Sequence, residues 1–330
     1  MREKSKNILS LILRFGLSAA LLIYLSRQID AEHTVEVVKS ADIGFILLGL
    51  AIFLLVNLGA LIRWWGLIKA LELDVTFQSV VRYYFIGLFG NLFLPTAIGG
   101  DLIKTIGLCT NSQQKPKVVG SVLLDRLSGF AGLVVVAILA YVFGHSYIGD
   151  PSLLMSIGVL AAVSIVATAV LFHEGIYSFC CRIFTPFPRI KEGLMDMHYD
   201  IALLKGRKST LVVAVGISCF IQAILALMFM SIAWGLHQQV ALIYFLIFVP
   251  LICVASAVPS IGGLGVREAG AVYLFGKIGV ASGVALSISL MSFLYMVFIG
   301  LVGAGVYLMT RSPKPAELAK QAGVPITPEG

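Results

Sequence analysis

The chain reads Asn91-Leu-Phe-Leu-Pro95-Thr-Ala-Ile-Gly99-Gly100-Asp101-Leu-Ile-Lys104 in its first half. A similar pattern recurs in the second half as Ala257-Val-Pro259-Ser-Ile-Gly262-Gly263-Leu-Gly265-Val-Arg267-Glu268. Each copy lies in apolar sequence and runs from a proline through paired glycines to charged residues. Interrupted apolar segments at matching positions of two halves are typical of the central binding site of a membrane transporter. The repeat therefore predicts both a membrane fold and the location of its site.

The composition indicates the class of protein. Hydrophobic residues make up 59% of the 330 positions and charged residues 12%, whereas a soluble domain has about twice that share of charge. We therefore expect an all-α polytopic membrane protein. The net charge of +7 is attributed to cytoplasmic loops and contact with anionic lipid heads, and no nucleic acid partner is expected.

Apolar segments of about 20 residues are long enough to cross the ~30 Å hydrocarbon core of a bilayer. Two further apolar regions, 79–108 and 240–281, are interrupted at Pro95 and Pro259 because proline removes a backbone donor and breaks a helix. Six uninterrupted segments are expected to be full transmembrane helices: 8–26, 43–62, 118–143, 153–172, 210–235 and 283–309.

The distribution of basic residues decides how the two interrupted regions cross. Lys and Arg favour the cytoplasmic side, and Lys115 and Lys117 reach it only if region 79–108 enters and leaves on that face. The same count makes region 240–281 a hairpin that enters from outside. The prediction is six full helices plus two oppositely oriented re-entrant hairpins in an inverted repeat, approximately 8–143 and 153–309. Two through-spans per region are the alternative.

The domain organisation follows from these spans. Residues 1–309 form a single transmembrane domain, and both termini are placed in the cytoplasm. Residues 310–330 contain four prolines and few apolar side chains, so we expect a disordered cytoplasmic tail.

Ionisable groups at membrane depth usually face a cavity and mark a substrate path. Helices that restart after the glycine pairs would aim free backbone N–H groups at a phosphate. Cationic side chains would supplement them, and acidic ones would balance the cations or carry a coupling proton. The alternative is that Asp125–Arg126 and Arg267–Glu268 pair to fix helix packing, while Arg63 reaches the interface. The candidate substrate-binding residues are Arg63, Asn91, Gly99, Gly100, Asp101, Lys104, Asp125, Arg126, Gly262, Gly263, Arg267 and Glu268.

The sequence has no Walker A, HExxH or GxSxG motif, and its five cysteines lack the spacing of a metal site. We therefore expect no catalytic residues, no metal and no cofactor. An intramembrane lipid-modifying enzyme, with Asp101 or Glu268 as acid or base, is the second hypothesis. A non-transporting partner of a cell-envelope glycosyltransferase or synthase is the third.

Taken together, these motifs resemble the flippase-like family that includes the N-terminal membrane module of lysylphosphatidylglycerol synthase/flippases. The resemblance implies movement of an aminoacylated phospholipid or a polyprenyl-phosphate-linked sugar between leaflets, in a bacterial inner (plasma) membrane. No aminoacyl-transferase domain is expected after the last span. The matching elements cover about 8 to 309 and are Arg63-Trp-Trp, Asn91…Pro95…Gly99-Gly100-Asp101, Asp125-Arg126…Gly129 and Pro259…Gly262-Gly263…Gly265…Arg267-Glu268.

Overall fold

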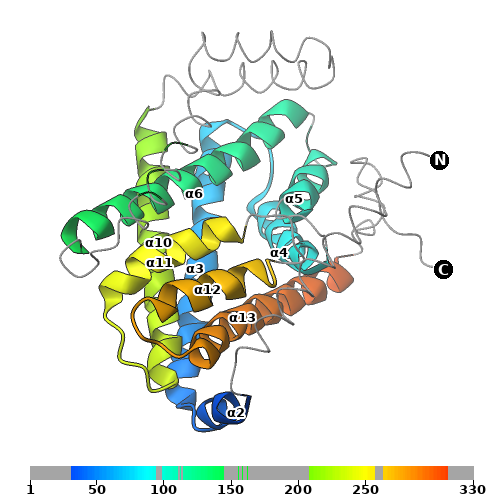
Figure 1. Ribbon diagram of the computed structural model, residues 1–330. Coiled ribbons are helices and arrows are strands. Elements are labelled where there is room, and N and C mark those ends of the chain that lie inside the picture. Colours follow the sequence, from blue (N-terminus) through cyan, green and yellow to red (C-terminus); the bar gives the residue numbers. More distant parts are fainter. Residues whose placement is uncertain are drawn as a thin grey trace, which may run out of the picture. The chain divides into compact units, whose positions relative to one another are not determined.

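The computed structural model describes residues 31–93, 99–110, 112, 114–144, 155, 158, 162, 208–256 and 263–310. Within these residues every regular element is an α-helix and there is no strand (Figure 1), which confirms the all-helical class. The helices are α2 (Ala31–Lys39), α3 (Ile43–Ala70), α4 (Phe77–Phe93), α5 (Gly99–Cys109), α6 (Lys115–Gly144), α10 (Lys208–Gly235), α11 (Leu242–Ala255), α12 (Val266–Gly276) and α13 (Ser282–Met309).

Four of these helices, α3, α6, α10 and α13, are long and apolar enough to cross a membrane. They correspond to four of the six expected spans, although α3 continues to Ala70 rather than ending at residue 62. The expected span 8–26 and the tail 311–330 lie outside the described residues, as does nearly all of span 153–172. The number of spans therefore stays a prediction.

Each interrupted region forms two short helices. Helices α4 and α5 contain 17 and 11 residues, and α11 and α12 contain 14 and 11. At about 1.5 Å per residue, α5 and α12 are each about 16 Å long, roughly half the hydrocarbon thickness. Neither of these two helices alone is long enough to cross a bilayer.

The two helices of the first region run antiparallel. The Asn91 side chain, near the end of α4, accepts a hydrogen bond from the Gly100 amide at the start of α5. Near the other ends of the two helices, Gly107 of α5 lies against Tyr83 of α4, so that a Cβ on Gly107 would collide with the Tyr83 ring. The contacts move backward along α4 as they move forward along α5, which is the geometry of a helical hairpin.

The second region has the same arrangement. A Cβ on Gly263 would lie 3.3 Å from the Ser256 Cβ, and one on Gly270 would lie 3.9 Å from the Ile252 side chain. Helices α11 and α12 are therefore antiparallel as well. The Pro95 and Pro259 tips of both hairpins lie outside the described residues.

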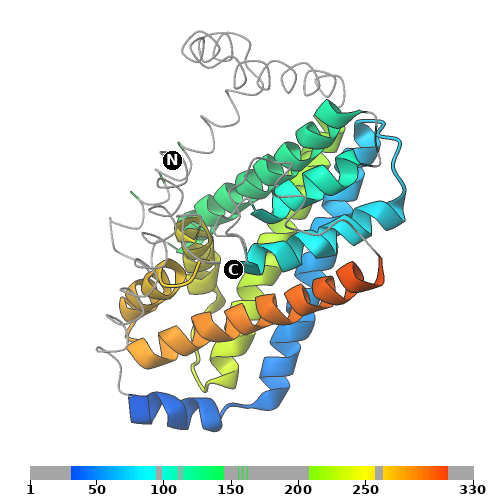
Figure 2. The same cartoon turned by 90° about the vertical axis from the view of Figure 1, so that its right-hand side faces the viewer.

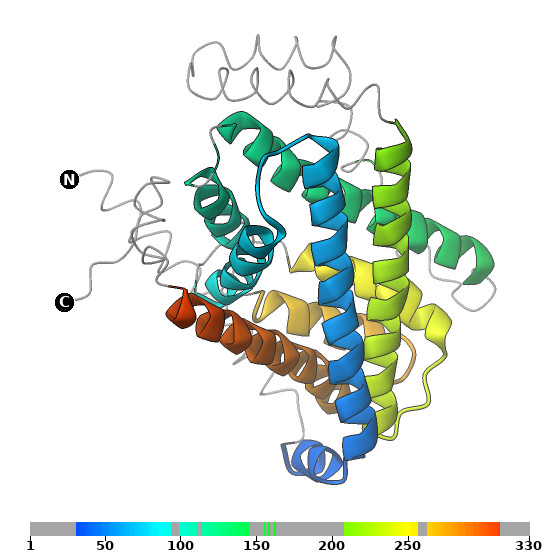
Figure 3. The same ribbon diagram turned by 180° about the vertical axis from the view of Figure 1, so that it is seen from behind.

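The chain divides into two compact units. Unit 1 contains Met1–Val56, Val81–Gly107 and Ile224–Gly330, and unit 2 contains Asn57–Val80 and Leu108–Ala223. Each unit takes segments from both halves of the sequence, and most of both hairpins belongs to unit 1. Helices α3 and α10 run side by side (Figure 3) and are joined by a bond from Ser231 Oγ to the Phe45 carbonyl within unit 1.

Helix α13 contacts both hairpins within unit 1. Its N-terminal half packs on α12, where Ser289 bonds Arg267 and Glu268. Its C-terminal half approaches α4 so closely that a Cβ on Gly303 would overlap the Phe85 carbonyl. Glycine is therefore required at position 303 for this helix contact. One continuous helix thus supports the second hairpin at one end and the first hairpin at the other.

Candidate functional site

The start of α12 is fixed by a side chain of its own first turn. Gly265 precedes the helix with φ of 88°, a left-handed conformation that favours glycine. Its amide donates a 2.6 Å hydrogen bond to Glu268 Oε2, which places a carboxylate at the positive end of the helix dipole. The helix begins at Val266 rather than directly after Gly263, so the expected restart point was wrong by a few residues.

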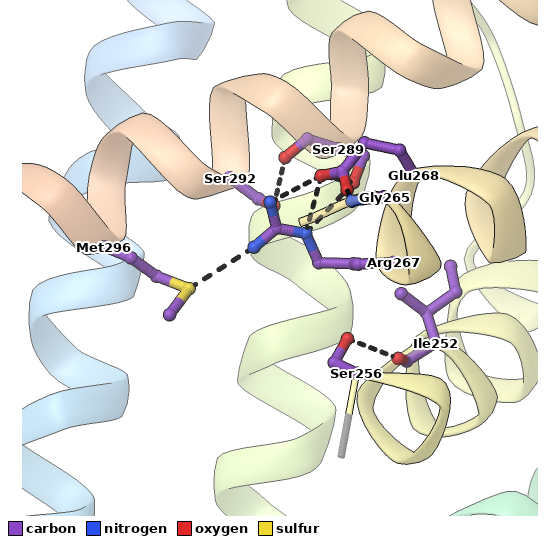
Figure 4. Close-up of polar contacts among 8 residues, drawn as sticks. All are labelled: Ile252, Ser256, Gly265, Arg267, Glu268, Ser289, Ser292 and Met296. Atoms are coloured by element: carbon purple, nitrogen blue, oxygen red, sulfur yellow. Dashed lines mark hydrogen bonds and ion pairs between the residues drawn. The ribbon is translucent and has the colours of Figure 1, made fainter. Parts of the chain in front are cut away.

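The other oxygen of Glu268 collects three donors (Figure 4). Its Oε1 accepts hydrogen bonds from Arg267 Nη2 at 2.6 Å, from Arg267 Nε at 3.1 Å and from Ser289 Oγ at 3.0 Å. Both charged side chains are buried, with Glu268 0% and Arg267 5% exposed. The guanidinium also lies 5.2 Å from the Phe293 ring centroid and 3.4 Å from Met296 Sδ. Arg267 and Glu268 thus form a buried ion pair, and Ser289 bonds it to α13.

The first hairpin holds a second buried ion pair. Lys104 Nζ lies 3.2 Å from Asp101 Oδ1 and 4.8 Å from the centroid of the Tyr84 ring. Both residues are buried, at 7% and 9% exposure. The Gly100 amide donates a 2.8 Å bond to Asn91 Oδ1. The expectation of free N–H groups is therefore corrected at Gly100 and Gly265, because each amide already has a side-chain acceptor.

A third buried ion pair lies in unit 2 and was not expected as a pair. Arg63 Nε donates a 2.8 Å bond to Asp125 Oδ1, and Arg63 Nη1 donates a 2.7 Å bond to Ser218 Oγ. The Arg63 side chain is 10% exposed and is held by Asp125 and Ser218; the alternative that it reaches the membrane interface stays a prediction. Gly129 leaves room for the guanidinium, since a Cβ there would lie 3.3 Å from Nη1.

The twelve sequence-predicted residues thus fall into separate groups. Those of unit 1 are Asn91, Gly99, Gly100, Asp101, Lys104, Gly263, Arg267 and Glu268, and those of unit 2 are Arg63, Asp125 and Arg126. Gly262 lies outside the described residues. That the twelve residues line one substrate-binding site stays a prediction.

Sequence reasoning missed the polar partners on the long helices. Ser218 and Ser289 are buried hydroxyls within apolar spans, at 1% and 0% exposure. Their sequence signal was a serine within an apolar transmembrane segment, because a hydroxyl away from water needs a hydrogen-bond partner. Tyr84, which lies under the Lys104 ammonium, had no such signal because aromatic residues are common in these helices.

Within the described residues no group of three or more His, Cys, Asp or Glu side chains is placed to hold a metal. A cavity of about 680 Å³ opens at the junction of α3, α10 and α11, lined by Phe45, Trp234, His237, Gln239, Val240 and Ala241. None of the predicted site residues lines it. Each hairpin therefore contains a buried ion pair of one cation and one carboxylate next to an aromatic ring.

Comparison with known proteins gives two matches. The family described as "Lysylphosphatidylglycerol synthase TM region" matches residues 11–303. A relative from Pyrococcus horikoshii, described as "UPF0104 membrane protein PH1989", is 26% identical over an alignment of 304 residues; the match covers 84% of this chain and 90% of the relative. Both matches extend over the hairpins and over all three buried ion pairs.

Proposed function

This chain belongs to the lysylphosphatidylglycerol synthase TM region family, and from that premise we propose that it moves an anionic or modified lipid between the two leaflets. The substrate would be an aminoacyl-phospholipid or a polyprenyl-phosphate-linked lipid. The protein is an integral membrane protein. We propose the bacterial inner membrane as its location, with both termini in the cytoplasm and a membrane synthase or glycosyltransferase as a partner.

The observation that carries this proposal is the pair of short antiparallel hairpins, each with a buried ion pair. Burying a charge in the membrane is costly, and such charges usually belong to a pathway for a polar group. Helices α5 and α12 are too short to span the bilayer alone. Re-entrant hairpins that enter from opposite faces would bring their charged first turns to the same depth, as in transporters with inverted repeats.

The ion pairs suggest how a head group is held. Lys104 pairs with Asp101 and its ammonium lies over the Tyr84 ring, so an incoming phosphate would compete with Asp101 for that ammonium. Arg267 has the analogous choice between Glu268 and a lipid phosphate. The acyl or prenyl tails would stay in the bilayer while α13, which contacts both hairpins, transmits the rocking of one against the other.

The test is transport by the full chain reconstituted in liposomes with a fluorescent anionic phospholipid. Lys104→Met should lower the rate of lipid movement about tenfold or more, the effect of about 1.4 kcal/mol on the barrier. Lys277→Met is the matched control because Lys277 also lies 4.8 Å from an aromatic centroid, that of Tyr273, but is exposed. It should transport like the unaltered protein.

Lys104→Arg keeps the positive charge and should restore part of the rate if charge at this position serves the substrate. Equal rates for Lys104→Met, Lys277→Met and the unaltered chain would contradict the site. Turnover of the lipid in detergent, where leaflets no longer exist, would instead favour the lipid-modifying enzyme.

A further inference from the structure

Helix α2 has an apolar face that the other described residues leave exposed. Val35 and Val38 lie three positions apart on one side of the helix and are 49% and 40% exposed. Glu36 and Lys39 are also exposed and form a neighbouring polar face. Helix α2 packs against α13, and the half-buried Val37 lies on the side opposite the exposed arc, on which Lys39 is one turn from Val35. The helix is amphipathic, with valines exposed beyond the contact with α13.

The position of α2 is fixed at the elbow that leads into α3. The Asp42 amide donates a 2.8 Å bond to the Gly235 carbonyl at the end of α10. His237 Nε2 lies 2.8 Å from the Ser40 carbonyl, and the Gly44 amide donates to Asp42 Oδ1 at 2.8 Å. These bonds hold α2 across the end of α3 (Figure 2), so its exposed face has a defined direction within unit 1.

The turn between α2 and α3, residues 40–42, directly precedes a helix long and apolar enough to cross a membrane. Ile43 and Leu47 in the first turns of α3 are 67% and 57% exposed, as expected of side chains that face lipid. Trp234, at the end of α10, is 41% exposed and makes an edge-to-face contact with Phe45. Tryptophan is enriched at the membrane–water interface. The start of α3 and the end of α10 thus carry the exposed apolar and tryptophan side chains expected near the membrane–water interface, and α2 adjoins them.

We propose that α2 is an interfacial helix, seated in the head-group layer of the bilayer with Val35 and Val38 turned toward the acyl chains. Its binding is hydrophobic rather than electrostatic. Residues 30–42 carry Asp30, Glu32, Glu36 and Asp42 against Lys39, so an anionic membrane would repel this segment rather than attract it. The helix therefore fixes the depth and rotation of α3 in the membrane. This inference does not depend on lipid transport.

The test uses the full chain in phosphatidylcholine liposomes, with nitroxide labels on single cysteines introduced after the native cysteines are replaced. Labels at positions 35 and 38 should collide several-fold more often with oxygen, which concentrates in lipid, than with a water-soluble nickel chelate. A label at Glu36 should show the opposite preference, and one at Lys39, a turn beyond Val35, should lie between the two. The pattern should persist when phosphatidylglycerol is added.

Nickel access at all four positions would place α2 in water and overturn the proposal. Shielding of positions 35 and 38 that disappears when the protein is diluted in lipid would show that a second copy of the chain covers the valines, and would also overturn it. A second measurement avoids substitutions altogether. Lipids with a photoreactive diazirine in the acyl chain should label Val35 and Val38 of the unaltered protein, and labelling confined to Glu36 and Lys39 would contradict the inference.

Discussion

Removing the Glu268 carboxylate should destabilise the protein strongly. In the Glu268→Ala variant the buried Arg267 guanidinium loses its partner, at a cost of about 3–5 kcal/mol. The Gly265 amide loses its acceptor as well, which adds about 1 kcal/mol for the helix cap. The total expected loss is about 4–6 kcal/mol, because Glu268 is 0% exposed and the unpaired charge would be buried.

The double variant Glu268→Ala/Arg267→Met separates charge compensation from the cap. With both charges gone, only the cap and the packing change remain, and the loss should fall to about 1–2 kcal/mol. The assay is reversible unfolding in mixed micelles with increasing dodecyl sulfate, followed by tryptophan fluorescence. Ser292→Ala is the control, since among the described residues Ser292 Oγ bonds a carbonyl of its own helix, that of Ser289.

A double variant no more stable than Glu268→Ala would refute this reasoning. It would mean that the carboxylate acts through its hydrogen bond to Gly265 and not through the neutralisation of Arg267. The single variant would also contradict the ion-pair account if its free energy of unfolding differed from that of Ser292→Ala by less than about 0.5 kcal/mol, the usual size of a neutral change.

Three further changes follow from the described contacts. Ser218→Ala should lower the free energy of unfolding by about 1.5–3 kcal/mol, measured in the same micelles, because it removes a hydrogen bond to the charged group of Arg63. Gly107→Ala should be destabilising because its Cβ would meet the Tyr83 ring, whereas Gly276→Ala, with open space at its Cβ, should be near neutral by thermal unfolding. Gln222→Leu should leave stability unchanged or raise it by about 1–3 kcal/mol, since Gln222 Oε1 is buried without a partner among the described residues.

The hairpins were predictable because proline and paired glycines interrupt an apolar segment for a local reason. A proline cannot continue the hydrogen-bonding pattern of a helix, and glycines permit turns and close approach. The structure accordingly ends α4 before Pro95 and starts α5 at Gly99. Charge counting predicted hairpins rather than through-spans, and because the antiparallel contacts of α4 with α5 fit both, that choice stays a prediction.

The pairing of the charges was less predictable because it depends on contacts between helices distant in the chain. Arg63 reads as an interfacial arginine beside two tryptophans, yet its partners lie 62 and 155 positions away in Asp125 and Ser218. Pairing at that separation is set by helix packing, which apolar patterning describes poorly when every face of a helix is apolar. The hydrogen bond that the Gly265 amide donates to Glu268 was not predicted from the sequence. The start of α12 was expected two residues earlier, which would have put another amide at the start of the helix.

The spacing of the three ion pairs has a consequence for how the chain is made. Asp101 with Lys104 and Arg267 with Glu268 are close in sequence, so each can neutralise as soon as its own segment leaves the ribosome. Arg63 has no such neighbour. An arginine at the centre of an inserting helix costs about 2.5–3.5 kcal/mol. Arg63 lies toward the C-terminal end of α3, so we expect α3 to carry a smaller cost until the ribosome has delivered Asp125. We therefore expect a stage of synthesis in which Arg63 has been inserted with α3 but Asp125 has not yet been made. That stage ends when α6 is inserted.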